Sequence, residues 1–273
     1  MSNITIIESF HNPLKIDVKE LWRYRELLWS MSLRDFKIRY SNAALGLVWA
    51  FLMPAATIGV LWFIIQMRGG NTFHSHIPSI VLVACGYTAW SFFQTLFTEG
   101  GSSIIQSQNM VRKIYFPRLI LPLSKSLTGL IDFGISLLIL VILIAIYGVK
   151  ISPNIIYLPL FVLLVIMCGL AGGLWVSALS IRFRDFKIVT PLISRMGLFL
   201  SCIMFPFSLL SDKLKIYFSF NPLVGVVEGF RWSILGEGTL NHYMFISLSI
   251  VLLMFVSGIF YFNSIEKKIA DLI

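Results

Sequence analysis

Two charged side chains stand out because each lies inside a long apolar stretch. Asp132 and Arg195 are each about two helical turns from the same end of their apolar windows. A charge at the middle of a bilayer costs roughly 2.5–3.5 kcal/mol on insertion scales, so both are functional candidates. Their equal depth favours an ion pair between two helices. The alternative is a charged lining at the inner mouth of a transport pathway.

Much other chemistry is missing from the sequence. It contains no GxxxxGK[ST] motif, so the chain does not build a Walker-type nucleotide site by itself. HExxH, GxSxG and paired-cysteine signatures are also absent, so we expect no metal site. Asp132 is the one clear acid well inside an apolar window, whereas a proton relay needs several. An external energy source is therefore implied.

The composition excludes a soluble protein. Hydrophobic residues make up 57% of the 273 residues and charged residues only 13%, and the mean hydropathy is +0.84. Soluble proteins carry about 25% charged residues, so this chain has too few charges to cover a water-facing surface. A net charge of +9 would admit a nucleic-acid binder. The basic residues lie at the ends of apolar runs, however, which indicates a membrane and no nucleic-acid partner.

Six apolar windows are long enough to cross about 30 Å of hydrocarbon. They are Ala44–Gln66, Ile77–Thr98, Lys125–Tyr147, Ile155–Ser180, Ile188–Leu210 and His242–Phe262. The sequence therefore predicts an all-α integral membrane protein with six transmembrane helices. Because six is even, both termini are expected on one side.

Basic residues in the connections predict the orientation. One side collects Lys15, Lys19, Arg23, Arg25, Arg34, Lys37, Arg39, Arg112, Lys113, Arg118, Arg182, Arg184, Lys187, Lys267 and Lys268. The other side has Arg68, Lys150, Lys213, Lys215 and Arg231. By the positive-inside rule the first side is cytoplasmic, so we expect a multi-pass protein with both termini in the cytoplasm.

An amphipathic helix is predicted before the first span. Asp17 and Glu20 have capping-box spacing. The apolar face is predicted to comprise Val18, Leu21, Trp22, Leu28 and Trp29. Such a helix fits the cytoplasmic headgroup layer, and the alternative is a soluble helix packed on a partner subunit. Residues 1–40 are thus expected to form a cytoplasmic N-terminus, and residues 41–273 the six-span domain.

The stretch Ser211–Asn241 contains two apolar pieces that are each too short to span. Asn221 and Pro222 separate them. This pattern predicts a re-entrant helical hairpin that enters from the outer face before the last span. A loop lying on the outer surface is the alternative. Glu228 and Arg231 are three residues apart and are expected to pair on one helix face.

An ordered set of motifs resembles a known family. Arg34-Asp-Phe-Lys-Ile-Arg-Tyr40, Leu45-Gly-Leu-Val-Trp49 and Pro54 are similar to the entry to the first span in membrane subunits of ABC type-2 exporters of lipid-linked polysaccharide, meaning O-antigen, capsular polysaccharide and teichoic acid. Later matches are Asn109 to Lys113, Phe116-Pro117, Pro122, Asp132, Arg184-Asp185, and Asn221-Pro222 through Arg231. One departure is Phe205-Pro206-Phe207-Ser208, where the family often has a Ser-Pro-aromatic-Tyr type stretch.

The resemblance implies a permease in the cell inner, or plasma, membrane. Two copies of the six-span subunit would form a homodimer that encloses the pathway, with two separate ATP-binding subunits on the cytoplasmic side. ATP and Mg²⁺ would bind those partners, so we expect this chain to hold no cofactor and to be no enzyme. The substrate would be a polysaccharide on a lipid carrier. The alternatives are a type-2 ABC permease for another hydrophobic cargo, such as a drug or a lipid, and a membrane-embedded transferase.

Roles can be assigned to particular residues as hypotheses. Arg34, Lys37 and Arg39 are expected to bind the lipid pyrophosphate, because Arg and Lys suit phosphate oxygens; attraction to ordinary anionic lipids is the alternative. ATPase coupling is assigned to the segments that hold Asn109, Arg112, Lys113, Arg184 and Asp185. The glycan pathway is assigned to Trp49, Phe63, Trp90, Phe93 and Phe205. Asn221, Pro222, Glu228 and Arg231 belong to the hairpin, which would act as an outer gate.

Overall fold

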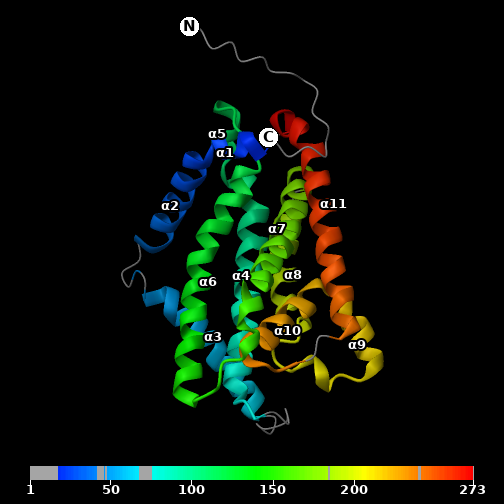
Figure 1. The fold of residues 1–273 in the computed structure, drawn as a ribbon. Coiled ribbons are helices and arrows are strands. Elements are labelled where there is room, and N and C mark those ends of the chain that lie inside the picture. The colour runs from blue at the N-terminus through cyan, green and yellow to red at the C-terminus, as the bar shows by residue number, and fades with distance from the viewer. Residues whose placement is uncertain are drawn as a thin grey trace.

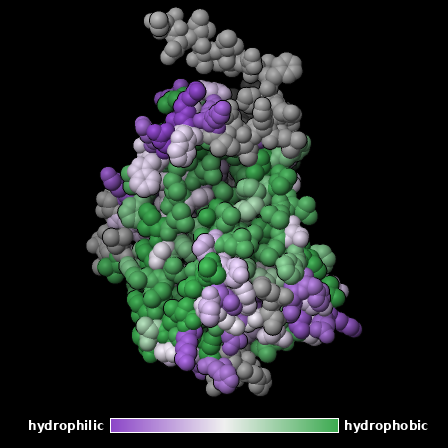
Figure 2. All heavy atoms as spheres, in the orientation of Figure 1, coloured by the Kyte–Doolittle hydropathy of each residue, from purple (hydrophilic) through white to green (hydrophobic). Residues whose placement is uncertain are grey.

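The computed structural model describes residues 18–41, 46, 48–67, 76–183, 185–238 and 241–272. Within these ranges the regular elements are all helical (Figure 1). Five helices are long and apolar enough to cross a membrane. They are α3 (Val48–Met67), α4 (Ser79–Gln106), α6 (Ile120–Tyr147), α7 (Leu158–Arg182, preceded by the short helix η1, Pro153–Tyr157) and α11 (His242–Leu272). Figure 2 shows a broad hydrophobic band between two more polar ends, as expected for a multi-pass membrane protein.

Helix α4 is the centre of the bundle, and it packs most extensively against α6 and α7. Small residues allow the close approach of α4 and α7. A Cβ atom added to Gly173 would lie 2.9 Å from the carbonyl oxygen of Leu96, so only glycine fits there without a shift. Close backbone contact through small residues is a common means of helix association in membranes.

The fifth expected span, Ile188–Leu210, is shorter than predicted. Helix α8 covers Phe186–Leu200, which is about 22 Å and too short to cross the hydrocarbon alone. Residues 201–211 continue without an α-helix, although Cys202 and Ile203 are fully buried. Cys202 has a φ of 55°, and Pro206 supplies no N–H for a helical turn. The prediction of one continuous helix to Leu210 was therefore wrong.

The N-terminal amphipathic region forms two helices, α1 (Val18–Arg23) and α2 (Arg25–Ser41), that are separated at Tyr24. Leu21 and Leu28 pack on a core cluster with Met31, but Trp22 and Trp29 are 69% and 59% exposed. The predicted apolar face is thus divided between leucines that pack on the bundle and tryptophans that are exposed in the single chain.

Helix α2 is also fastened along α6, by hydrogen bonds that side-chain hydroxyls donate to backbone carbonyls. The Ser32 hydroxyl donates to the Ser124 carbonyl at 2.9 Å, and the Thr128 hydroxyl donates to the Ser32 carbonyl at 3.3 Å. The contact with α6 decides which face of α2 is inward. Hydrophobic spacing in α2 alone contains no information about this partner.

The segment before the last span is a helical hairpin, α9 (Asp212–Ser219) and α10 (Pro222–Leu235). The Asn221 side chain caps α10 and donates to the Leu200 carbonyl at the end of α8. At the other end, the Ile234 carbonyl accepts from the Ser152 amide, between α6 and α7. Nearly all of α10 is buried, against α11, α4 and α7. This burial contradicts a loop lying on the surface and agrees with a hairpin inserted into the bundle.

The elements expected in the cytoplasm share one end of the bundle. Residues from α1, α2, the short helix α5 (Gln108–Lys113) and the last part of α11 belong to one apolar cluster. In Figure 1 these elements lie together at the top, and the connection between α6 and α7 lies at the bottom. The structure thus agrees with the predicted grouping of these elements.

Candidate functional site

Asp132 lies where α2 meets α6, and its carboxylate binds two residues of α2. It forms an ion pair with Arg39 and accepts a hydrogen bond from the Tyr40 hydroxyl. The Arg39 guanidinium also lies 3.4 Å from the Glu99 carboxylate of α4. Arg195 is exposed on α8 and is not the partner of Asp132. The predicted pairing of these two charges was wrong because α2, which the prediction placed at the headgroups, lies against α6.

A second set of ion pairs continues this cluster toward the α5 end. Lys125 Nζ of α6 lies 2.8 Å from Asp35 and 3.8 Å from Glu99. Asp35 also pairs with Arg34 at 2.9 Å. Three carboxylates therefore alternate with three basic groups across α2, α4 and α6. We call the set Arg34, Asp35, Arg39, Glu99, Lys125 and Asp132 the charge cluster.

The cluster perturbs the ionisation of residues on α2. Burial alone raises the pKa of Asp35, but the ion pairs with Lys125 and Arg34 outweigh it and hold the pKa below its usual value. Burial and the hydrogen bond to Asp132 raise the pKa of Tyr40 to about 12. Asp35 is thus a carboxylate and Tyr40 a neutral hydroxyl at neutral pH.

These pairings bear on the phosphate hypothesis for Arg34, Lys37 and Arg39. Lys37 is exposed, and Arg34 is half exposed beside Asp35. Arg39 instead lies between Asp132 and Glu99. Two carboxylates cancel the positive potential that an anion needs, so Arg39 is poorly suited to bind phosphate in this arrangement.

A partly open cavity of about 370 Å³ adjoins the charge cluster between α2, α3, α4 and α6, and its lining combines polar groups with a larger apolar surface. Trp49, from the predicted glycan pathway, lines it. A second cavity of about 390 Å³ is mostly apolar and is lined by Trp90 and Phe93. Phe205 packs against Phe218, and Phe63 is 57% exposed on α3. The five predicted aromatic residues are therefore distributed over different surroundings.

Glu228 and Arg231 of α10 form the predicted ion pair, at 2.8 Å, and both are buried. Arg231 also donates to three backbone carbonyls that the sequence did not suggest. The acceptors belong to Leu82, Ile203 and Phe205. Glu228 in turn accepts from the Phe207 amide at 3.1 Å. This pair thus satisfies the backbone of the non-helical segment after α8, which lipid would leave unsatisfied.

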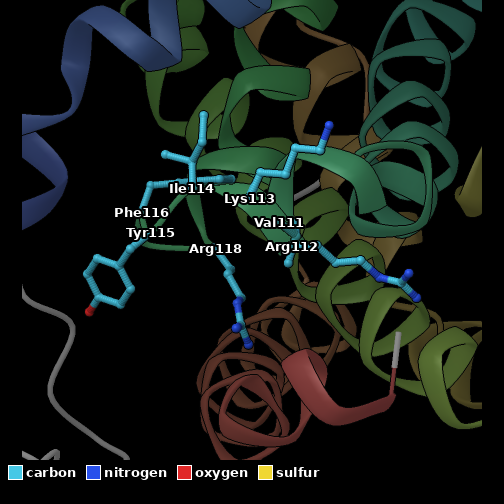
Figure 3. A pocket seen from close by; sticks show the side chains of 7 residues that line it. All are labelled: Val111, Arg112, Lys113, Ile114, Tyr115, Phe116 and Arg118. Atoms are coloured by element: carbon cyan, nitrogen blue, oxygen red, sulfur yellow. The ribbon is translucent and has the colours of Figure 1, made fainter.

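The connection from α5 to α6 forms an exposed basic surface at the end of the bundle. Residues 111–118 surround a cavity of about 220 Å³. Figure 3 shows the Arg112, Lys113 and Arg118 side chains extending from it in different directions. Asn109 lies on α5, and Asp185 is exposed at the start of α8. Arg184, also predicted to act in coupling, lies outside the described residues.

Sequence reasoning missed Glu99, Lys125 and Tyr40 as members of this site. Glu99 directly follows the second apolar window and Lys125 begins the third. A charge at the edge of a window is usually assigned to the interface. The signal that could have found them is that both edges belong to the same side of the predicted bundle.

The long apolar helices of the described chain, with more polar surface at the two ends of the bundle, define a multi-pass membrane protein. More specifically, the chain belongs to the ABC-2 type transporter family, whose model matches residues 26–235. It is accordingly a transport component and not an enzyme.

Relatives of this chain include named export proteins. It is 29% identical to the O-antigen export system permease protein RfbA of Myxococcus xanthus, over 78% of this chain and 82% of the relative. It is 23% identical to the RfbA permease of Klebsiella pneumoniae, over 91% and 95%. It is 24% identical to the polysialic acid transport protein KpsM of Escherichia coli, over 79% and 85%.

Proposed function

We propose that this chain is the permease subunit of an ATP-driven exporter that moves a lipid-linked polysaccharide out of the cytoplasm across the inner or plasma membrane. The observation that carries this function is the similarity to O-antigen and polysialic acid permeases along most of both chains. The cargo is of the O-antigen, capsular or teichoic-acid type. No observation favours a drug as cargo.

Energy is supplied by a separate ATPase at the end of the bundle that contains α5. The chain has no Walker motif, and the exposed basic connection at residues 111–118 offers a compact docking element. Asn109, Arg112 and Lys113 are its coupling residues, with Arg184 and Asp185 in the next connection. Both termini share this cytoplasmic end. ATP and Mg²⁺ bind to the partner.

Two copies of the chain assemble with two ATPase subunits. Apolar side chains of α3 and α8 that are exposed in the single chain offer a surface for this assembly. They include Met53 and Val60 of α3 and Leu192, Met196 and Phe199 of α8. The sixth crossing is made by α8 together with residues 201–211.

Several residue roles remain proposals. Arg34 and Lys37 bind the lipid pyrophosphate or anionic lipids at the exposed side of α2. Trp49, Phe63, Trp90, Phe93 and Phe205 are candidates for the glycan pathway. The hairpin that contains Asn221, Pro222, Glu228 and Arg231 forms the outer gate.

The function is tested by deleting the gene and measuring surface polysaccharide. The expected result is loss of polysaccharide from the surface and its accumulation inside the cell, with recovery on expression of the intact chain. The chain should also copurify with an ATPase subunit, and lipid-linked glycan should stimulate hydrolysis. Normal surface polysaccharide in the deletion strain, or purification without any ATPase, would contradict the proposal.

A further inference from the structure

The cavity beside Asp132 combines apolar surface with polar side chains, and it lies at a depth where polar groups are costly. Ser91, which lines it, is at the middle of the 28-residue helix α4. Asp132 is about 18 Å along α6 from its first residue. Polar and ionisable groups so deep in a membrane bundle are expensive and are retained mainly for function. We therefore expect the cavity to bind a ligand that forms hydrogen bonds with these polar groups.

Half of the lining residues carry a hydroxyl group or an aromatic ring, and the others include Ala50, Met53 and Pro54. Rings come from Tyr40, Trp49 and Tyr87, and further hydroxyls from Ser91, Thr95 and Ser136. The hydroxyls of Ser91 and Thr95 donate to carbonyls of their own helix, at 3.1 Å each. Their oxygen lone pairs are thus oriented as acceptors for another donor. The similarly sized second cavity is mostly apolar by comparison, so size alone does not produce this lining.

The charges at the cavity favour a neutral ligand. Arg39 and Asp132 line it and neutralise each other, and Glu99 lies 3.4 Å from Arg39. An anion would therefore find no net positive charge there, because the carboxylates and basic groups of the charge cluster balance one another. A neutral polyol meets both donors and acceptors, and its C–H faces can cover an aromatic ring such as Trp49, which is 40% exposed.

We propose that this cavity is a subsite for a neutral sugar residue, held by the Asp132–Arg39 pair and by the hydroxyls of α4 while Trp49 covers one face. The inference rests on the proposed export function and adds where a sugar is recognised. In this proposal the sugar residue and the lipid pyrophosphate of the substrate bind at two different sites.

The test is photocrosslinking in cells that make the polysaccharide. Benzoylphenylalanine replaces Met53, which lines the cavity, or Met67 of the same helix as a control. The two methionines are 62% and 75% exposed, and they lie on the same helix face about four turns apart. After irradiation, adducts are separated by gel electrophoresis, oxidised with periodate and labelled with a hydrazide. Only labelled bands shifted by more than the mass of one lipid are counted, because periodate also oxidises the glycerol diol of phosphatidylglycerol.

We expect periodate-sensitive adducts at Met53, several-fold fewer at Met67, and none at Met53 when glycan synthesis is blocked. Thr95→Val should reduce the Met53 adduct about three- to tenfold, the loss of one hydrogen bond. Thr98→Val is the matched control, because Thr98 makes the same type of bond within α4 but does not line the cavity.

Absent sugar adducts at Met53, equal adducts at Met67, or equal effects of the two threonine substitutions would each overturn the subsite. Surface polysaccharide is measured in the same cells. If its export requires the permease but the adducts fail, only the subsite is wrong. If export does not require the permease, the proposed function is wrong.

Discussion

The charged side chains inside this bundle stay there because each has specific partners. In the charge cluster, acids and bases from three helices alternate. At Arg231, one guanidinium instead serves Glu228 and three backbone carbonyls of different segments. Arginine suits this position because its planar group carries five N–H donors in a fixed geometry, whereas lysine has three donors at a single point.

At the residue scale we predict that Arg231→Ala destabilises the protein by about 3–5 kcal/mol, because Glu228 stays buried without its partner. Thermal unfolding in detergent measures this change. Adding Glu228→Gln should restore part of the loss. The matched control is Lys215→Ala, which removes the i,i+3 pair with the exposed Asp212 and should have little effect. Equal losses of thermal stability in the two alanine variants would show that the buried Arg231 contacts stabilise the protein no more than an exposed ion pair does.

At the scale of elements, α4 and its contact with α7 organise the bundle. The helices approach closely at Gly173, where a Cβ would be 2.9 Å from the Leu96 carbonyl. Backbone atoms cannot move aside as a flexible side chain can. The contact between α4 and α7 therefore depends on glycine at position 173, which has no Cβ atom.

We predict that Gly173→Ala lowers stability by about 1–3 kcal/mol through overpacking. Gly134→Ala on α6 is the control, because a Cβ there would meet nothing within 4 Å. Alanine is the better helix former, so this control should be neutral or slightly stabilising. Unfolding midpoints in detergent compare the two. A Gly173→Ala protein as stable as the control would contradict the close contact.

At the scale of the whole molecule, the number of times the chain crosses the membrane depends on α8, because this helix is too short to span the bilayer alone. Among the residues that the structure describes, five helices are long enough to span, and an odd number of crossings would separate the termini. The shared cluster of α1, α2, α5 and α11 places both ends of the described chain together, which agrees with the proposed sixth crossing through residues 186–211.

The topology is tested with single cysteines in a chain whose Cys85, Cys168 and Cys202, all buried, are replaced by serine or alanine. Lys150→Cys, between α6 and α7, should react with an impermeant maleimide in intact cells. Lys113→Cys, at the end of α5, should react only after permeabilisation. Both positions are exposed, so labelling depends only on which side of the membrane each cysteine occupies. Labelling of both from one side would refute the predicted orientation.

Sequence patterns alone predicted the class of protein, six spans of which five are long helices, a hairpin or surface loop around Asn221, and the Glu228–Arg231 pair. Apolar length, proline position and i,i+3 spacing are local properties, so they can be read along the chain. The pairing of Asp132 with Arg39 rather than Arg195, and the end of α8 at Leu200, become apparent only from the packed helices. Those outcomes depend on which helix lies beside which. Partners 93 residues apart, such as Arg39 and Asp132, meet only after the helices have packed.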